Sequence, residues 1–255
     1  MVSVEKNEVL TETAEGAVKI FSLNRPERHN AINLNLAESL VAALERAETD
    51  GETKVVVVTG SGDKAFCAGQ DMLEASGIEP GRADPKSSSA YLAIDRFAAS
   101  PLPLIAAING YCYGGGAALA LACDIRISAE RATFRLPGAE YGLVVGAASL
   151  PRLVGAARAK EIILTARRFD SEQAGDWGMV NYVVPDNSVL SKSLEMAEAI
   201  AANSVIAVRE SKRVIDLATM VEEAVSNENE INRKLRGSEE QSDRFRSATK
   251  KVTGR

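Results

Sequence analysis

Two glycine-rich segments are the parts of this 255-residue sequence best suited to chemistry: 65–71 (AFCAGQD) and 109–116 (NGYCYGGG). Glycine lets backbone N–H groups approach a ligand closely. A helix that begins near Gly115 leaves its first amides unpaired and turns the positive end of its dipole toward the loop. If one amide from each segment pointed at the same atom, the pair would stabilise a developing oxyanion.

Other kinds of site find less support. The sequence has no G-x-x-x-x-G-K-[ST] and no G-x-G-x-x-G phosphate-binding pattern. It has one histidine, His29, and three cysteines without a C-x-x-C spacing, which argues against a metal site. A glycine-rich turn often serves only tight packing. From the residues alone, the prediction is therefore an anion-stabilising site without a metal.

Buried strands must position these segments. The apolar, β-branched run at 54–59 predicts a strand covered on both faces, and 104–108 predicts a second one, so we expect a parallel sheet. Residues 9–23 predict a hairpin that turns at 15–16. Residues 35–47 predict an amphipathic helix, with Asn35 and Glu38 as its capping pair.

The pattern of strand, glycine-rich loop and helix then recurs. Strands are expected at 104–108 and 124–128, with a helix at 117–122, which indicates layered β-β-α units of the α/β class. A linker rich in Pro, Ser and Gly is expected at 79–89. Beyond residue 147 the sequence predicts one further strand at 180–184, and helices at 188–202, 205–217 and 221–236. We expect a core over 1–200 and a helical region over 201–255.

The amino-acid composition narrows the classes of molecule that this protein could bind. The net charge of −5 argues against nucleic acid and anionic membranes as partners. The N-terminus carries acidic residues where an export signal would be basic, and the apolar stretch 104–123 is interrupted by Asn109 and several glycines. We therefore expect a cytoplasmic protein with no membrane segment, and the odd number of cysteines agrees with a reducing compartment.

Three segments resemble the signature blocks of the crotonase family, the enoyl-CoA hydratase/isomerase superfamily: 24–31 (NRPERHNA), 66–71 (FCAGQD) and 106–128 (AAINGYCYGGGAALALACDIRIS). Their order and spacing agree with the family, and the similarity extends over about residues 8–236. The resemblance implies a crotonase (ClpP-like) fold of repeated ββα units. It also implies a helical C-terminal region that forms homotrimers, often paired as homohexamers.

The same resemblance implies an acyl-CoA site. The backbone N–H groups of Gln70 and Gly115 would hold the oxygen of an acyl-CoA thioester, with coenzyme A part of the substrate and no further cofactor. The remaining residues expected to bind substrate are Arg28 and Lys64 near the phosphates, Ala65 and Phe66 near the nucleotide, Ala68 along the pantetheine, and Asp71, Tyr113 and Gly138 around the acyl group.

The sequence departs from the family at the acid and base. Hydratases of the superfamily use two glutamates, and the corresponding positions here are Ala118 and Gly138, neither of which can transfer a proton. Glu140 is the candidate replacement, because desolvation in the pocket would raise its pKa. A minor hypothesis is a bicarbonate base, as in some naphthoate synthases with a glycine at that position. However, the aspartate that accompanies it there aligns with Val145.

The expected function is that of an acyl-CoA enzyme of the enoyl-CoA hydratase/isomerase family, a lyase or an isomerase. One alternative is an acyl-CoA hydrolase or decarboxylase, in which the two amides do most of the work. Another is a non-catalytic acyl-CoA-binding subunit, which the missing glutamates make conceivable. Cys67 and Cys112 lack an adjacent base that would generate a thiolate, so we expect them to pack rather than react.

Overall fold

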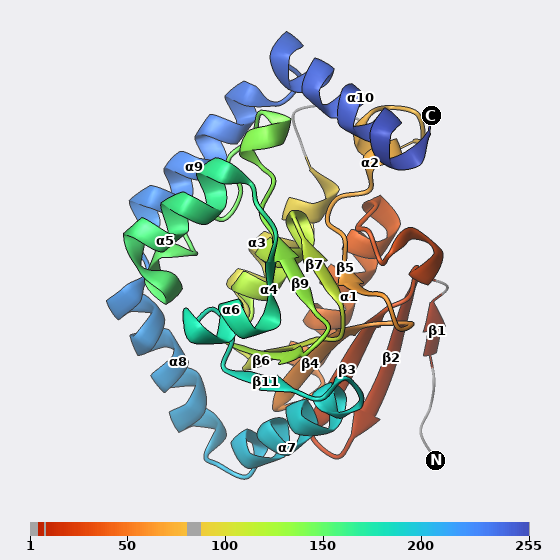
Figure 1. The fold of residues 1–255 in the computed structure, drawn as a ribbon. Helices are drawn as coiled ribbons and strands as arrows, with labels where there is room; N and C mark the ends of the chain where they lie inside the picture. Colours follow the sequence, from red (N-terminus) through yellow and green to blue (C-terminus); the bar gives the residue numbers. More distant parts are fainter. Residues whose placement is uncertain (1–4, 8, 81–87, 255) are drawn as a thin grey trace.

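The computed structural model describes residues 5–7, 9–80 and 88–254. Its centre is a seven-stranded sheet with the order β1-β2-β3-β4-β6-β8-β11 (Figure 1). Strand β2 is antiparallel to both of its neighbours, β1 and β3, and the strands from β3 to β11 are parallel. The strands are β1 (Glu5–Asn7), β2 (Leu10–Glu15), β3 (Val18–Leu23), β4 (Val55–Gly60), β6 (Leu104–Ile108), β8 (Ile125–Ala129) and β11 (Tyr182–Val184).

A second sheet of four short strands has the order β10-β9-β7-β5. These strands are β5 (Ala65–Cys67), β7 (Tyr111–Tyr113), β9 (Thr133–Arg135) and β10 (Phe169–Asp170). The pairs β4/β5, β6/β7 and β8/β9 each place one strand in each sheet, which confirms the predicted repetition of β-β units in a mixed α/β fold. Both glycine-rich segments therefore lie in or beside the small sheet.

Helices cover the sheets. The α-helices are α1 (Leu34–Thr49), α2 (Met72–Ala75), α3 (Ser89–Ala98), α4 (Gly115–Ala122), α5 (Pro151–Thr165), α6 (Ser171–Asp176), α7 (Val189–Ala201), α8 (Val205–Thr219), α9 (Glu222–Leu235) and α10 (Glu239–Thr253). Three short 3₁₀ helices are η1 (Pro26–Arg28), η2 (Ala139–Tyr141) and η3 (Asp186–Ser188). Helices α1, α3 and α4 enclose the larger apolar core, and α7 packs on the opposite face of the large sheet.

Several predicted elements are confirmed, and some details are corrected. The cap of α1 is Asn33, whose side chain accepts the Leu36 N–H at 3.0 Å, rather than Asn35, which lies inside the helix. Helices α5 and α10 were not predicted. Most of the expected linker at 79–89 falls outside the described residues, which resume at residue 88.

The C-terminal helices are tied to the core by polar contacts. The Asn232 side chain on α9 accepts the Val144 N–H at 3.0 Å and donates to the Val144 carbonyl oxygen at 2.6 Å. Helix α9 thereby holds the loop that follows η2. The predicted boundary near residue 200 stays a prediction, and these bonds show how closely the two parts are joined.

Candidate active site

A cavity of about 490 Å³ lies between the two glycine-rich segments and the C-terminal helices. Its wall includes residues 68–73, residues 113–115 of the second segment, residues of α3, η2 and α10, and Arg236, which directly follows α9. The wall of this cavity therefore combines segments that are far apart in the sequence, between residue 27 and residue 253.

Gln70 is held in an extended bridge opposite Ile32. The Ile32 N–H donates to the Gly69 carbonyl oxygen at 2.7 Å, and the Asp71 N–H donates to the Ile32 carbonyl oxygen at 2.9 Å. Because the N–H of the residue between two such bonds points to the opposite side, the Gln70 N–H faces away from Ile32. Gln70 itself lines the cavity on that side.

Gly115 is the first residue of α4. The preceding residue, Gly114, has a φ of +51° and donates its own N–H to the Arg135 carbonyl oxygen at 2.9 Å. The first N–H groups of a helix have no intrahelical acceptor. Within the described part of the chain, neither the Gly115 nor the Gln70 amide has a hydrogen-bond acceptor.

The two amides are close neighbours. A β-carbon built on Gly69 would lie 3.1 Å from the Gly115 nitrogen, and one built on Gly115 would lie 3.3 Å from the Gln70 nitrogen. The φ of Gly69 is +106°, which side chains rarely adopt. Glycine at both positions thus allows the segments to approach, as the sequence analysis expected.

Asp71 fixes the end of the first segment. Its carboxylate pairs with the Arg25 guanidinium at 2.9 Å, and it accepts the Leu73 N–H at 3.0 Å as the N-cap of α2. The residue is only 3% exposed. Although Asp71 borders the cavity, its charge is therefore engaged by Arg25.

The predicted coenzyme A contacts separate into two groups. Arg28 and Ala68 line the main cavity, and Arg28 pairs with Glu79 at 2.9 Å, a hydrogen bond that raises the pKa of the guanidinium. Lys64 and Ala65 line an adjacent hollow, which shares His29 with the main cavity. The structure thus places these four residues on neighbouring surfaces.

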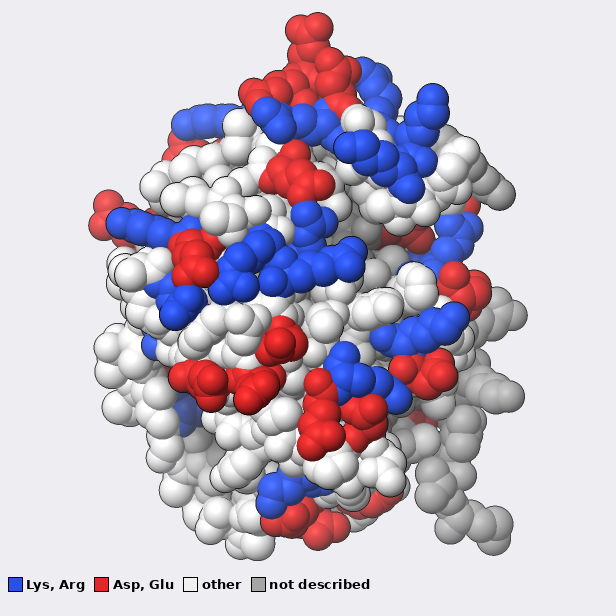
Figure 2. All heavy atoms as spheres, in the orientation of Figure 1, with Lys and Arg blue, Asp and Glu red and all other residues white. Residues whose placement is uncertain are grey.

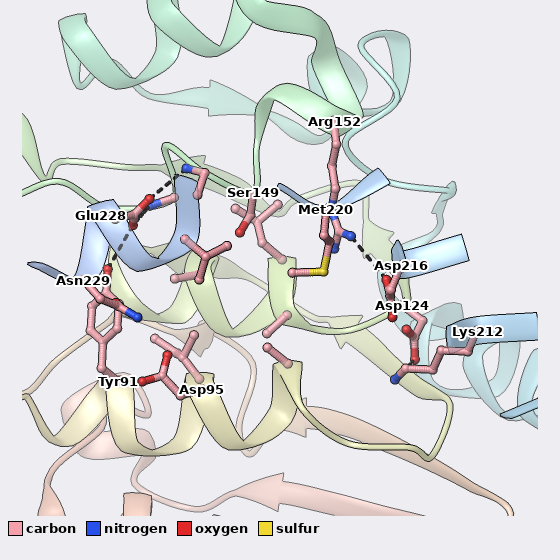
Figure 3. Close-up of a pocket in the computed structure, with 18 residues that line it drawn as sticks. Tyr91, Asp95, Asp124, Ser149, Arg152, Lys212, Asp216, Met220, Glu228 and Asn229 are labelled. Atoms are coloured by element: carbon pink, nitrogen blue, oxygen red, sulfur yellow. Dashed lines mark hydrogen bonds and ion pairs between the residues drawn. The ribbon is translucent and has the colours of Figure 1, made fainter. Parts of the chain in front are cut away.

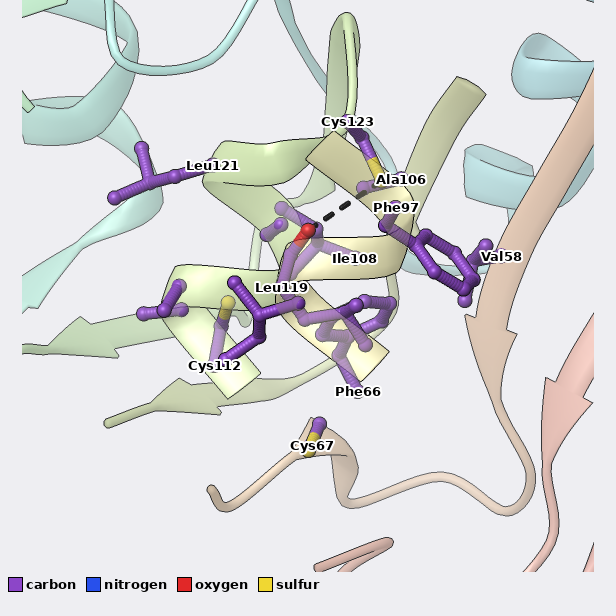
Figure 4. Close-up of a cluster of buried hydrophobic side chains, with 14 of the residues drawn as sticks. Val58, Phe66, Cys67, Phe97, Ala106, Ile108, Cys112, Leu119, Leu121 and Cys123 are labelled. Atoms are coloured by element: carbon purple, nitrogen blue, oxygen red, sulfur yellow. Dashed lines mark hydrogen bonds between the residues drawn. The ribbon is translucent and has the colours of Figure 1, made fainter. Parts of the chain in front are cut away.

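Phe66 is a correction. Its side chain is completely buried in the apolar core, because β5 is covered along its whole length, and it does not line the cavity. Cys67 and Cys112 lie in the same core (Figure 4). Burial raises the pKa of the Cys67 thiol to about 12 and that of Cys112 well above its ordinary value. Both cysteines pack, as expected.

Tyr113 and Gly138 both line the cavity. The Tyr113 hydroxyl is hydrogen-bonded to that of Thr133 at 2.7 Å. A β-carbon at Gly138 would lie 2.8 Å from the Leu143 carbonyl oxygen and 2.9 Å from the Val145 side chain. A glutamate at position 138 therefore does not fit unless this loop moves.

Glu140 is a second correction. Its side chain is 48% exposed, forms an ion pair with Arg135, and is not among the residues that line the cavity. The short helix η2 turns it outward while Gly138 and Tyr141 face inward. Glu140 therefore lies where its carboxylate would not meet a substrate bound in the cavity.

Ala118, the other position of a family glutamate, lines a separate cavity of about 80 Å³ (Figure 3). Tyr91 and Glu228 lie in its wall. The Glu228 carboxylate accepts the N–H groups of Gly146 at 2.9 Å and Ala148 at 2.8 Å and lies 3.3 Å from the Tyr91 hydroxyl. This buried glutamate holds the loop that carries Val145.

Several polar residues of the main cavity escaped sequence reasoning, among them Ser88, Tyr91 and Arg236. The Arg236 guanidinium lies 3.5 Å from the Gln70 side-chain oxygen and 5.3 Å from the Tyr91 ring centre. No local pattern marks Arg236, because 166 positions separate it from Gln70.

The described residues contain no cluster of three or more metal-ligating side chains. None of the described helices is long and apolar enough to cross a membrane. A band of Lys and Arg side chains crosses the middle of the face shown in Figure 2, among scattered acidic side chains. Acidic proteins can thus still present local positive charge to an anion.

Comparison with known proteins identifies the family. Residues 13–252 match the family model for enoyl-CoA hydratase/isomerase. One relative is the Bacillus subtilis protein YngF, which is named as an enoyl-CoA hydratase/isomerase. It is 38% identical over 209 residues, covering 78% of this chain and 80% of that protein. The short-chain-enoyl-CoA hydratase of Clostridium acetobutylicum is 34% identical, covering 84% and 82%.

The solved structures agree. The crystal structure of an enoyl-CoA hydratase/isomerase from Pseudoalteromonas atlantica superimposes with a TM-score of 0.86 at 29% identity, covering 95% of this chain and 97% of that one. The fold is therefore the crotonase fold. This chain belongs to the enoyl-CoA hydratase/isomerase family of acyl-CoA enzymes.

Proposed function

We propose that the N–H groups of Gln70 and Gly115 form an oxyanion hole for the thioester carbonyl of an acyl-CoA. The observation that carries this proposal is the approach of two unpaired amides, from separate loops, on the wall of one cavity. Paired N–H donors stabilise the negative oxygen of an enolate or a tetrahedral intermediate more than the neutral carbonyl. Each such donor contributes about 3 kcal/mol to the transition state.

The chemistry that follows is addition of water to an enoyl thioester or migration of its double bond. In both, charge moves onto the thioester oxygen, and the two amides lower the barrier without taking a proton. The names of the relatives support this reaction class. The proton must be carried by a group other than Ala118 and Gly138.

A specific observation keeps hydrolysis or decarboxylation as the second candidate. Among the described residues, only Glu27 and Asp71 contribute carboxylates to the cavity wall, and Asp71 is paired with Arg25. Hydrolysis or decarboxylation can proceed with the oxyanion hole and either water or the substrate's own carboxylate. Neither reaction needs a glutamate at 118 or 138.

The rest of the proposed assembly follows the family. Arg28 and Lys64 would contact the phosphates of coenzyme A, which enters as part of the substrate without a further cofactor. We place the enzyme in the cytoplasm as a homotrimer or homohexamer. The three buried, unpaired cysteines support a reducing compartment, and light scattering would give the subunit number.

Purified protein tests the function directly. Loss of the enoyl absorbance of crotonyl-CoA would support hydration, and release of free thiol from acyl-CoA would support hydrolysis. Calorimetry with the same thioesters measures binding apart from turnover. Binding without turnover across enoyl, β-keto and malonyl thioesters would favour the non-catalytic subunit, and absence of any binding would refute the proposal.

A further inference from the structure

Arg236 is a buried cation in the wall of the main cavity. It follows the last residue of α9, its residue exposure is 9%, and it lines the cavity that also contains the Gln70 amide. Its contacts are uncharged: the Gln70 side-chain oxygen at 3.5 Å and the face of the Tyr91 ring. Burial lowers the pKa of the guanidinium.

Of the other arginines at or beside the cavity, three are already paired with a carboxylate, and Arg168 is exposed to solvent. Arg28 pairs with Glu79, Arg135 pairs with Glu140, and Arg25 pairs with Asp71. No carboxylate of the described residues lies within ion-pair distance of Arg236. A buried charge without a counter-ion is costly to the folded protein, and a ligand anion would offset that cost.

We infer that Arg236 binds a carboxylate carried by the acyl group, so that the enzyme's substrates are acyl-CoA thioesters with a second, anionic end. This inference rests on the proposed function, because it assumes that the thioester occupies the Gln70 and Gly115 amides. A guanidinium offers parallel N–H donors that match the two oxygens of a carboxylate.

The geometry limits the length of the acyl group. One residue, Gln70, contributes its backbone N–H to the proposed oxyanion hole and its side-chain oxygen to Arg236. The Ser88 hydroxyl donates to that same side-chain oxygen at 2.8 Å. The distance from thioester to carboxylate is therefore about the reach of one glutamine side chain and one hydrogen bond, which fits a chain of a few carbons.

The surrounding wall suits the rest of such a chain. Leu73, Leu143, Val145 and Phe245 line the cavity and offer apolar contact to methylene groups. An acyl group that ends in a methyl would fill this space but leave the guanidinium without an anion and with less access to water. The site would thus reject uncharged chains as well as favour anionic ones.

The test compares glutaryl-CoA with pentanoyl-CoA, which have the same number of acyl carbons and differ in the terminal carboxylate. Calorimetry on the full-length protein gives the Kd of each thioester. Because both ligands contain coenzyme A, its contribution to binding cancels in the ratio of the two Kd values. We expect glutaryl-CoA to bind about 10- to 100-fold more tightly, as one charged hydrogen-bonded pair provides. Arg236→Gln should abolish this preference, because it weakens glutaryl-CoA binding and removes the buried cation that disfavours pentanoyl-CoA, whose affinity should not fall. Arg236→Lys should restore part of the preference.

Arg168→Gln is the matched control. Arg168 also lines the cavity, but it is exposed and lies over the Tyr113 ring. The Arg168→Gln variant loses the same charge as Arg236→Gln, and we expect it to keep the preference for glutaryl-CoA. Equal binding of the two thioesters by the unmodified protein would overturn the inference and leave the proposed function standing. If Arg236→Gln lowered the affinities for glutaryl-CoA and pentanoyl-CoA equally, Arg236 would be a structural residue and the inference would also be overturned. If the unmodified protein bound neither thioester, both the inference and the proposed function would be refuted.

Discussion

A β-carbon added to Gly115 would lie 3.3 Å from the backbone nitrogen of Gln70. A side chain at position 115 would therefore crowd the Gln70 amide. The same hypothetical carbon would lie 3.1 Å from the Ala90 side chain, so it cannot readily move away from the amide.

Gly115→Ala should consequently lower kcat on the true substrate by about 100-fold, the usual effect of losing one oxyanion donor. The fold should persist, because the backbone at position 115 is helical. Steady-state kinetics and thermal unfolding would check both statements. Gly175→Ala, in α6 and outside the residues that line the cavity, is the matched control; an unaltered kcat in Gly115→Ala would contradict the oxyanion hole.

Gly138→Glu should not restore a hydratase glutamate. The added side chain would meet the Leu143 carbonyl oxygen and Val145, and overpacking of this kind costs about 1–3 kcal/mol. Urea unfolding should show that loss, and the double change with Val145→Ala should recover part of it. If Gly138→Glu were as stable as the unmodified protein, the loop would be more adaptable than the structure indicates.

Glu140→Gln should leave kcat within about twofold of the unmodified enzyme, as is usual for an exposed surface pair that contributes little. The carboxylate points away from the cavity and pairs with Arg135. Turnover measured beside Glu130→Gln, another exposed glutamate, would check this. A specific loss of more than tenfold for Glu140→Gln would return this residue to a role in proton transfer.

Asp71→Asn should destabilise the protein strongly. Removing one partner of a buried ion pair leaves the other charge uncompensated, at a cost of about 3–5 kcal/mol. Here that charge would be Arg25, whose side chain is 10% exposed. Chemical unfolding of Asp71→Asn, with exposed Asp63→Asn as the reference, measures the difference; equal stability of the two variants would argue against the ion pair.

The buried thiols should make the protein sensitive to alkali. Burial raises the pKa of both Cys67 and Cys123 to about 12, so the folded state favours the protonated thiols. Their contribution to stability is complete below the ordinary thiol pKa and should decline as the pH rises from about 9 toward 12. Urea titrations across this range test the decline, and substitution of both residues by Ala should reduce it.

Alkylation provides an independent measurement. Native protein at pH 8 should react slowly with iodoacetamide at all three cysteines, which are buried and unpaired. Protein in urea should react at all of them. Rapid native alkylation of Cys67 or Cys112 would show that this part of the core opens readily.

Much of the fold follows from local sequence. The apolar runs at 54–59 and 104–108 predict buried parallel strands because each lies between glycine or proline breaks, and β4 and β6 confirm them. The glycine-rich segments indicate where two parts of the backbone come close to one another, at Gly69 and Gly115. The hairpin formed by β2 and β3 likewise follows from the residues around a two-residue turn, although the turn lies at 16–17 and the prediction was 15–16.

The tertiary structure decided which side chains share the cavity. Glu140 lies only two positions from Gly138, yet the turn of η2 and the pairing with Arg135 direct it outward. Arg236 is 166 positions from Gln70, yet the packing of α9 brings the two within 3.5 Å. Local sequence specifies backbone conformation because its causes act between near neighbours, whereas the polar groups of a cavity are brought together by packing between distant segments.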